Sequence, residues 1–74
     1  SATMSRPEKH SLTLRGHRTS VSLEPEFWAA FRKLAQARGQ GLNDLAAEID
    51  ATRGDTGLAG AIRLTVLRDL QGRS

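Results

Sequence analysis

His17-Arg18-Thr19-Ser20-Val21-Ser22-Leu23-Glu24-Pro25-Glu26-Phe27-Trp28 is the stretch that decides the fold. Between Arg18 and Leu23 polar and apolar side chains alternate, as in a strand with one face in a core. The apolar face would carry Thr19, Val21 and Leu23, and the polar face Arg18, Ser20 and Ser22. Glu24-Pro25 ends the strand and starts a helix, because proline lacks a backbone N–H and is favoured at the first helical position. The sequence therefore predicts a mainly α chain with one short β-strand.

A single strand followed only by helices leaves its backbone N–H and C=O groups without partners. A second copy of the chain can supply them. Two strands pairing antiparallel about a two-fold axis would form an intermolecular β-ribbon, with the apolar faces on a core shared by both copies. We therefore expect an intertwined homodimer.

Residues 11–14 also alternate, but their apolar side chains occupy even positions, whereas those of the main strand occupy odd positions. The phase changes at Arg15-Gly16-His17, where glycine permits an unusual backbone conformation. Two structures follow from this change. One is a long ribbon with a β-bulge, and the other is a hairpin within one chain that turns at Gly16. We favour the ribbon.

Three helices should follow the strand. Residues 25–38 place Phe27, Trp28, Phe31, Leu34 and Ala35 on one stripe, and Gly39 suits the helix end. A second helix should start near Gly41 or Leu42, turn Leu42, Leu45, Ala46 and Ile49 inward, and fray by Arg53. A third should span residues 58–70, with a stripe of Leu58, Ile62, Thr65, Val66 and Leu70 that Leu64 and Leu67 widen. This width favours a contact between subunits.

The expected dimer core combines apolar residues of the strand and of the first two helices. It consists of Val21, Leu23, Phe27, Trp28, Phe31, Leu45 and Ile49. We expect a flexible N-terminal arm over residues 1–10 and one domain over residues 11–74. Dimerisation would strengthen the small core of a 74-residue chain.

The composition points to a nucleic-acid partner. Eleven Lys and Arg against eight Asp and Glu give a net charge of +3, and no residue between Lys9 and Leu23 is acidic. The chain has no cysteine, which suits a reducing cytoplasm. It has no apolar run of membrane-spanning length, so we expect no membrane partner.

The segment G-H-R-T-S-x-S-L-E-x-x-F-W, together with Gly39-Gln40-Gly41-Leu42-Asn43-Asp44-Leu45 at a helix start, resembles the ribbon-helix-helix family of bacterial DNA-binding repressors. The resemblance covers residues 15–49 and extends more loosely to the last helix. It implies a dimer whose ribbon enters the DNA major groove. It also implies that the first turn of the second helix, here Gly41, Leu42 and Asn43, sits against a DNA phosphate. Relatives often have Ser or Thr where this chain has Gly41, and the glycine-rich break before the third helix is a further departure.

We expect Arg18, Ser20 and Ser22 to contact bases, because arginine can bridge O6 and N7 of guanine and serine can bond either kind of groove edge. We expect Lys9 and Arg15, with the helix start at 41–43, to contact phosphates.

Two functions are consistent with these patterns. The first is sequence-specific binding of double-stranded DNA by a cytoplasmic, bacterial homodimer, with higher-order assembly on DNA as an extension, in the role of transcriptional repressor or autoregulator. The second is a dimeric protein-interaction or structural module on the same scaffold without DNA binding. No catalytic constellation, metal site, cofactor motif or small-molecule site is evident, since His10 and His17 have no cysteine and no nearby carboxylates to complete a ligand set. We therefore do not expect an enzyme.

Overall fold

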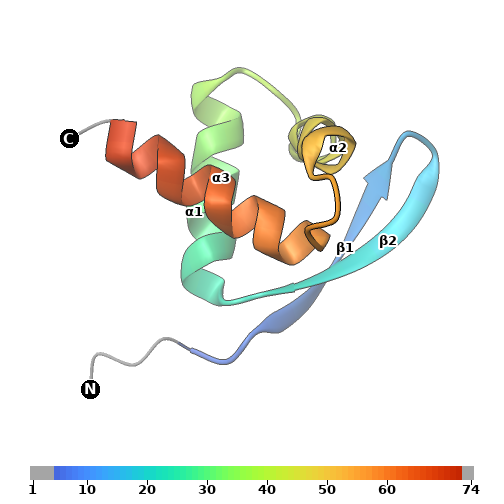
Figure 1. Ribbon diagram of the computed structural model, residues 1–74, viewed down its shortest axis with the longest axis horizontal. Helices are drawn as coiled ribbons and strands as arrows, with labels where there is room; N and C mark the ends of the chain where they lie inside the picture. The colour runs from blue at the N-terminus through green and yellow to red at the C-terminus, as the bar shows by residue number, and fades with distance from the viewer. Residues whose placement is uncertain (1–4, 73–74) are drawn as a thin grey trace.

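The computed structural model describes residues 5–72. Two strands, β1 (Glu8–Leu14) and β2 (His17–Leu23), are followed by the helices α1 (Pro25–Ala37), α2 (Leu42–Thr52) and α3 (Leu58–Gly72). Figure 1 shows the strands as a long curved hairpin whose turn lies at the end remote from α1. The three helices gather on one face of this hairpin.

The hairpin corrects the preference for a long bulged ribbon over a hairpin within one chain. β1 and β2 of the same chain pair antiparallel in a continuous register from Glu8↔Leu23 to Leu14↔His17. The turn between them consists of Arg15 with φ 52° and Gly16 with φ 86°. Two successive positive φ values are typical of a type I′ turn, whose twist matches that of the flanking strands. The chain therefore supplies the second strand for β2 itself.

The register explains why the apolar phase changes between the strands. In each pair of this hairpin, the two residue numbers add to an odd sum. An even-numbered residue of β1 therefore always lies opposite an odd-numbered residue of β2. Paired side chains lie on the same face of a sheet. Leu12 and Leu14 of β1 therefore share a face with Val21 and Leu23 of β2, and all four are buried. The phase change that suggested a bulge is the consequence of a two-residue turn.

Residues 8–10, which were expected to belong to a flexible arm over residues 1–10, lie in a strand. β1 begins at Glu8, so residues 8–10 belong to the hairpin, while residues 5–7 precede it without regular structure. Residues 1–4 lie outside the described residues. The strand reaches further toward the N-terminus because Glu8 and Lys9 find register partners in Leu23 and Ser22.

The helix boundaries agree with the sequence prediction to within two residues. Pro25 occupies the start of α1, and Glu24 precedes it in an extended conformation. After α1, Gly39 has φ 67°, and the N–H of Gln40 bonds to the carbonyl of Ala35, which closes the helix end. Gly41 is the extended residue before α2, and α2 ends at Thr52.

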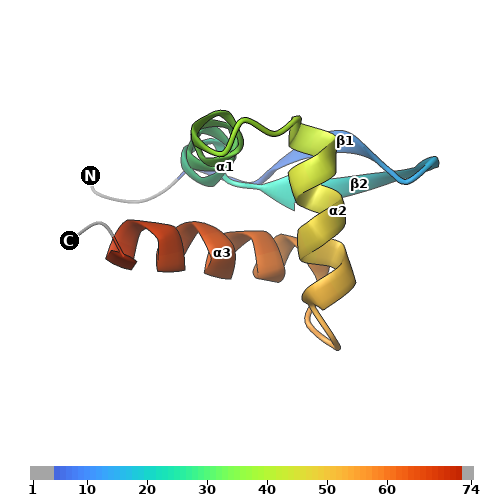
Figure 2. The same cartoon turned by 90° about the horizontal axis from the view of Figure 1, so that it is seen from above.

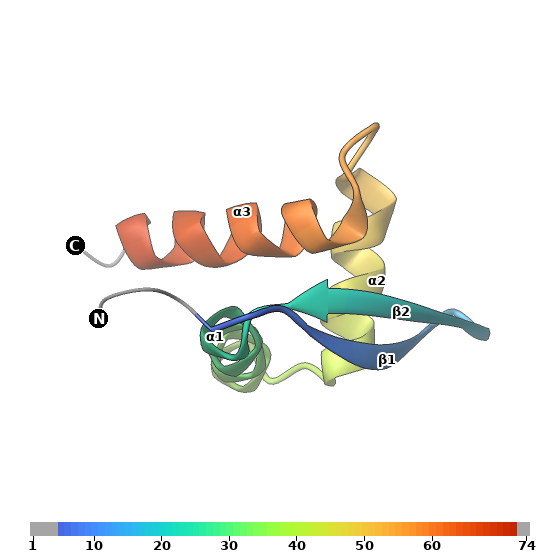
Figure 3. The same ribbon diagram turned by 90° about the horizontal axis from the view of Figure 1, so that it is seen from below.

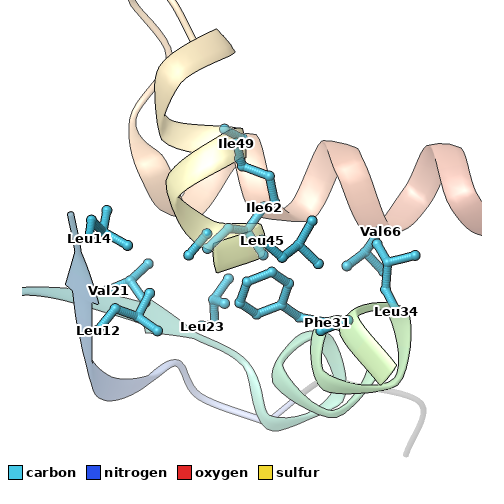
Figure 4. Close-up of a cluster of buried hydrophobic side chains, with 13 residues drawn as sticks. Leu12, Leu14, Val21, Leu23, Phe31, Leu34, Leu45, Ile49, Ile62 and Val66 are labelled. Atoms are coloured by element: carbon cyan, nitrogen blue, oxygen red, sulfur yellow. The ribbon is translucent and has the colours of Figure 1, made fainter. Parts of the chain in front are cut away.

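The core lies between the hairpin and the helices. Every element contributes to it, as Figure 4 shows for the side chains that point toward one another from the hairpin, α1, α2 and α3. The fully buried large side chains are Phe31, Leu23, Leu45 and Ile62. α3 contacts α1, α2 and β2, whereas α2 packs against β1. Figures 2 and 3 show β2 between β1 and α3. One chain thus buries its own core.

Five of the seven residues expected in a dimer core are buried within the single chain: Val21, Leu23, Phe31, Leu45 and Ile49. Phe27 and Trp28 are only partly buried against this cluster. The side chains of Leu64, Leu67 and Leu70 are 45%, 47% and 53% exposed. The prediction that Leu70 belongs to the inward stripe of α3 is therefore wrong. A contact between copies through these residues remains a prediction.

Candidate nucleic-acid interface

The outward face of the hairpin is a polar surface with a basic character. It consists of Lys9, Ser11, Thr13, Arg18, Ser20 and Ser22, all of them exposed. We call these six residues the outer face. The register pairs them as Lys9↔Ser22, Ser11↔Ser20 and Thr13↔Arg18. The alternation predicted for Arg18, Ser20 and Ser22 is confirmed, because their neighbours Val21 and Leu23 point into the core.

The outer face presents hydrogen-bonding groups without acidic side chains. Its six members offer hydroxyls, an ammonium and a guanidinium, which are suitable partners for DNA base edges and phosphates. Lys9, expected as a phosphate contact, sits at the end of the face nearest α1, opposite Ser22. Arg18 lies at the turn end. The two cations therefore mark opposite ends of one surface.

Arg15 lies in the turn, beyond the end of this face. It is the one residue other than glycine with a positive φ among residues 5–72. A non-glycine residue pays a steric cost in this conformation, and Asn or Asp tolerates it better than Arg. Backbone positions strained in this way cluster at functional sites. The cost in folding free energy is retained there because the side chain is needed for function. An exposed guanidinium at the tip of the hairpin suits a phosphate contact.

The first turn of α2 lies against the edge of β1. The backbone N–H of Thr13 donates a hydrogen bond to Oδ1 of Asn43, with an N–O distance of 3.1 Å. Thr13 sits one step beyond the pair that closes the turn, so its N–H points away from β2 and would otherwise lack a protein partner. Asn43 thus fixes the helix N-terminus beside the outer face. Its amide oxygen is engaged, which leaves its NH2 group and backbone N–H as the donors available to a phosphate.

Gly41 and Leu42, the other residues expected to contact a phosphate at this helix start, differ in what they can offer to it. Gly41 precedes the helix in an extended conformation, with no side-chain cap. Leu42 is half-buried and packs against the core, so its contribution to an anion site is its backbone N–H alone. Asp44 also belongs to the first turn. Its Oδ2 would lie 3.3 Å from a Cβ placed on Gly41, so a carboxylate stands close to the donors that a phosphate would use.

An ion pair holds α3 against the junction of β2 and α1. Nε and Nη2 of Arg63 donate to Oε1 and Oε2 of Glu24 at 2.9 and 3.1 Å, and Nη2 also reaches the carbonyl of Ser22 at 3.4 Å. The hydrogen bonds from Arg63 lower the pKa of the Glu24 carboxyl below its ordinary value of 4.5. The Arg63 guanidinium also lies 5.9 Å from the centre of the Phe27 ring. This link anchors the last outer-face residue of β2.

A stacked pair supports β1 from the inner side. The ring centres of His10 and Trp28 are 3.8 Å apart, and the rings are inclined by 2°. Trp28 is also tilted against Phe31 at 5.9 Å. His10 therefore contributes to packing between β1 and α1. The sequence pattern did not predict this packing role, because residues 1–10 were expected to form an arm.

Two further properties concern the described residues as a group. Among residues 5–72, no group of three His, Cys, Asp or Glu side chains is arranged to hold a metal ion. In the same part of the chain, no helix has both the length and the apolar character needed to cross a bilayer.

Comparison with known proteins defines the class of protein to which this fold and surface belong. A family model described as ribbon-helix-helix domain matches residues 7–70. The chain therefore belongs to the ribbon-helix-helix domain family, a family that is non-enzymatic and typically consists of DNA-binding transcription regulators. Searches of curated proteins and of solved structures returned no match. The resemblance inferred from residues 15–49 is confirmed and extends over most of the chain.

The structure brings together most of the residues predicted to form the site. Arg18, Ser20, Ser22 and Lys9 share the outer face, Arg15 adjoins it, and Asn43 is bonded to its edge. Ser11 and Thr13 belong to the same face but were not predicted, because the sequence pattern alone favoured a bulged ribbon over a hairpin that pairs β1 with β2. The signal that identifies them is the change of apolar phase at Gly16, which a hairpin explains.

Proposed function

We propose that this protein binds double-stranded DNA in a sequence-specific way, as a homodimer, and acts in the bacterial cytoplasm as a transcriptional repressor or autoregulator. The observation that carries the proposal is the outer face, on which six exposed polar or basic side chains lie in register on a two-stranded element. A two-stranded ribbon fits the major groove, which is about 12 Å wide. Membership of a family of DNA-binding regulators supports the same reading.

In this proposal the charged and polar groups have two roles. Arg18, Ser20 and Ser22 contact base edges, because they project from the outer face of β2 at two-residue steps. Lys9, Arg15 and the backbone donors at Gly41, Leu42 and Asn43 contact phosphates and set the position of the hairpin in the groove.

Binding to random duplex at low and moderate salt tests the proposal first. Neutralising several phosphates releases counterions, so affinity should fall steeply as the salt concentration rises. A site is then selected from a random pool. Arg18→Ala should lower affinity for that site by about 1 to 3 kcal/mol and change random binding little. Arg15→Ala should lower both affinities similarly and flatten the salt dependence. An equal loss on both duplexes for Arg18→Ala would assign Arg18 to phosphate instead.

The homodimer rests on two surfaces that suit a second copy. On the unpaired edge of β2, the backbone groups of Arg18 and Ser20 point away from β1, in the alternating pattern of antiparallel pairs. On α3, Leu64 and Leu67 lie three residues apart and about half exposed. Sedimentation at micromolar concentration should give twice the 8.0 kDa chain mass. Leu64→Ser combined with Leu67→Ser tests the helix surface, and a wild-type chain that sediments as a monomer contradicts the homodimer.

The second candidate function is a protein-interaction module without DNA binding. The observation that favours it is the same leucine surface on α3, combined with a net charge of only +3. Absence of duplex binding at every accessible salt concentration would select this alternative.

A further inference from the structure

We propose that β1 takes part in reading DNA sequence, through the hydroxyl groups of Thr13 and Ser11. This inference rests on the proposed function and extends it to residues outside the family-like strand. Both side chains are exposed, and both lie on the outer face opposite Arg18 and Ser20. One chain thereby presents a complete two-stranded reading surface.

The spacing of the strands supports a contribution from β1. Along β2, side chains on one face are about 6.6 Å apart, close to two base-pair steps of about 3.4 Å each. Arg18, Ser20 and Ser22 alone therefore sample a base pair only at every second step. β1 lies about 4.8 Å to the side of β2, across the width of the groove. Its hydroxyls can reach base edges that a single row of side chains leaves uncontacted.

The pairing of Thr13 with Arg18 brings these two side chains together on the outer face. The two residues form the second pair from the turn, which in a two-residue hairpin is a pair without mutual hydrogen bonds. Their Cα atoms are then about 4.5 Å apart, and their side chains lie closer together than in the neighbouring pairs. A base that meets the Arg18 guanidinium is therefore near the Thr13 hydroxyl.

The position of Thr13 is also fixed. Its backbone N–H is bound to Oδ1 of Asn43 at 3.1 Å, so β1 is held at this point by α2 as well as by β2. A side chain on a held backbone loses less freedom when it binds, which is a requirement for discrimination between bases. Ser11, two residues earlier, occupies the same face opposite Ser20. The pair Ser11–Ser20 extends the surface away from the turn.

Thr13→Val tests the inference, because it removes a hydroxyl and keeps the shape of the side chain. We expect affinity for the site selected by the wild-type protein to fall about 3- to 10-fold, as for loss of one hydrogen bond, and affinity for random duplex to stay unchanged. Thr13→Ser should restore binding, because it keeps the hydroxyl. Ser11→Ala should behave as Thr13→Val does, at a different base position. Thr56→Val is the matched control, since Thr56 is exposed in the loop before α3.

Repeating the selection with Thr13→Val and Arg18→Ala separates this inference from the proposed function. Relaxed preference at one or two base pairs for Thr13→Val, next to those relaxed by Arg18→Ala, supports reading by β1. If Arg18→Ala relaxes the preference while Thr13→Val and Ser11→Ala select the wild-type site with unchanged affinity, β1 does not read DNA and the proposed function stands. An equal loss for Thr13→Val on selected and random duplex also overturns the inference. If the wild-type protein binds no duplex, both the function and the inference fail.

Discussion

Asn43 and Thr13, thirty positions apart in the chain, are joined by a hydrogen bond of 3.1 Å that ties the first turn of α2 to the edge of β1. The bond occupies an N–H on a strand edge that would otherwise be open to another chain. It also sets where the helix N-terminus lies relative to the outer face. Replacing Asn43 should therefore affect both stability and binding.

Asn43→Ala should lower the free energy of unfolding by about 0.5 to 1.5 kcal/mol, the usual net value of one hydrogen bond. Asn43→Asp keeps an acceptor at the same place and adds a negative charge where the helix dipole favours it, so its stability should match the wild type. Urea unfolding of the three proteins measures the difference. Equal losses for both variants would mean that the side-chain oxygen does not carry the stabilisation.

Asp44→Asn should increase affinity for DNA if the first turn of α2 contacts a phosphate. The Asp44 carboxylate lies close to the donors of that turn, and removing a nearby like charge is worth about 0.5 to 1 kcal/mol, or about 2- to 5-fold. The increase should be the same on selected and random duplex, because phosphate contacts carry no sequence information.

Glu48→Gln is the control for this variant. It makes the same change in charge one turn further along α2, where the Glu48 carboxylate accepts a hydrogen bond from Gln40. Its effect on affinity should be smaller. If both variants raise affinity equally, the gain reflects net charge and the helix start has no special role.

Arg15→Asn should make the protein more stable and a weaker DNA binder. Asn accepts a positive φ at lower cost than Arg and is favoured before glycine in a type I′ turn, so we expect a gain of about 0.5 to 1 kcal/mol. Loss of the guanidinium should reduce affinity on all duplexes and flatten the salt dependence. Thermal melts and binding titrations measure the two effects. Arg18→Asn, within β2, should give no gain in stability, and a stabilised Arg15→Asn protein that binds as tightly as wild type would contradict the phosphate role.

Phe31→Ala should lower the free energy of unfolding by about 3 to 5 kcal/mol, because Phe31 is completely buried at the meeting point of the hairpin and the helices. A loss of this size can unfold a small domain. Phe31→Leu therefore serves as a milder probe, with an expected cost of about 1 kcal/mol. Arg32→Ala changes the exposed neighbour and should melt with the wild type. Equal melting of all four proteins would place Phe31 outside the core.

The Glu24–Arg63 pair predicts a dependence of stability on pH. The folded pKa of Glu24 is lower than its ordinary value of 4.5, so folding favours the ionised form. Its contribution to stability is therefore fully present above pH 4.5 and is lost as the pH falls through the folded pKa. The difference in unfolding free energy between wild type and Glu24→Gln should shrink on acidification below pH 4.5.

A double-mutant cycle isolates this pair from other carboxyl groups. Glu24→Gln should change stability less in an Arg63→Gln background than in the wild type, and the coupling should vanish at low pH. A coupling that stays constant across the acid range would show that the ion pair does not titrate with Glu24.

Local features of the sequence determined the secondary structure and the direction of its faces. The alternation from Arg18 to Leu23 placed Arg18, Ser20 and Ser22 outward, since successive strand side chains point to opposite faces whatever the partner strand is. Pro25 and the glycines at 39 and 41 set the ends of the helices, because proline and glycine act on the backbone of their own positions. The family followed from these same local motifs.

The tertiary structure alone decided which strand pairs with β2 and which side chains meet from distant segments. A strand from the same chain and one from a second copy satisfy the same backbone groups of β2, so the alternation could not choose between them. The structure shows that the partner is β1 of the same chain, joined to β2 by the type I′ turn at Arg15-Gly16. This pairing brings Ser11 and Thr13 to the outer face. Contacts such as Asn43 with Thr13 and Arg63 with Glu24 depend on how helices dock on the hairpin, which is set by packing of the whole core and not by any local pattern.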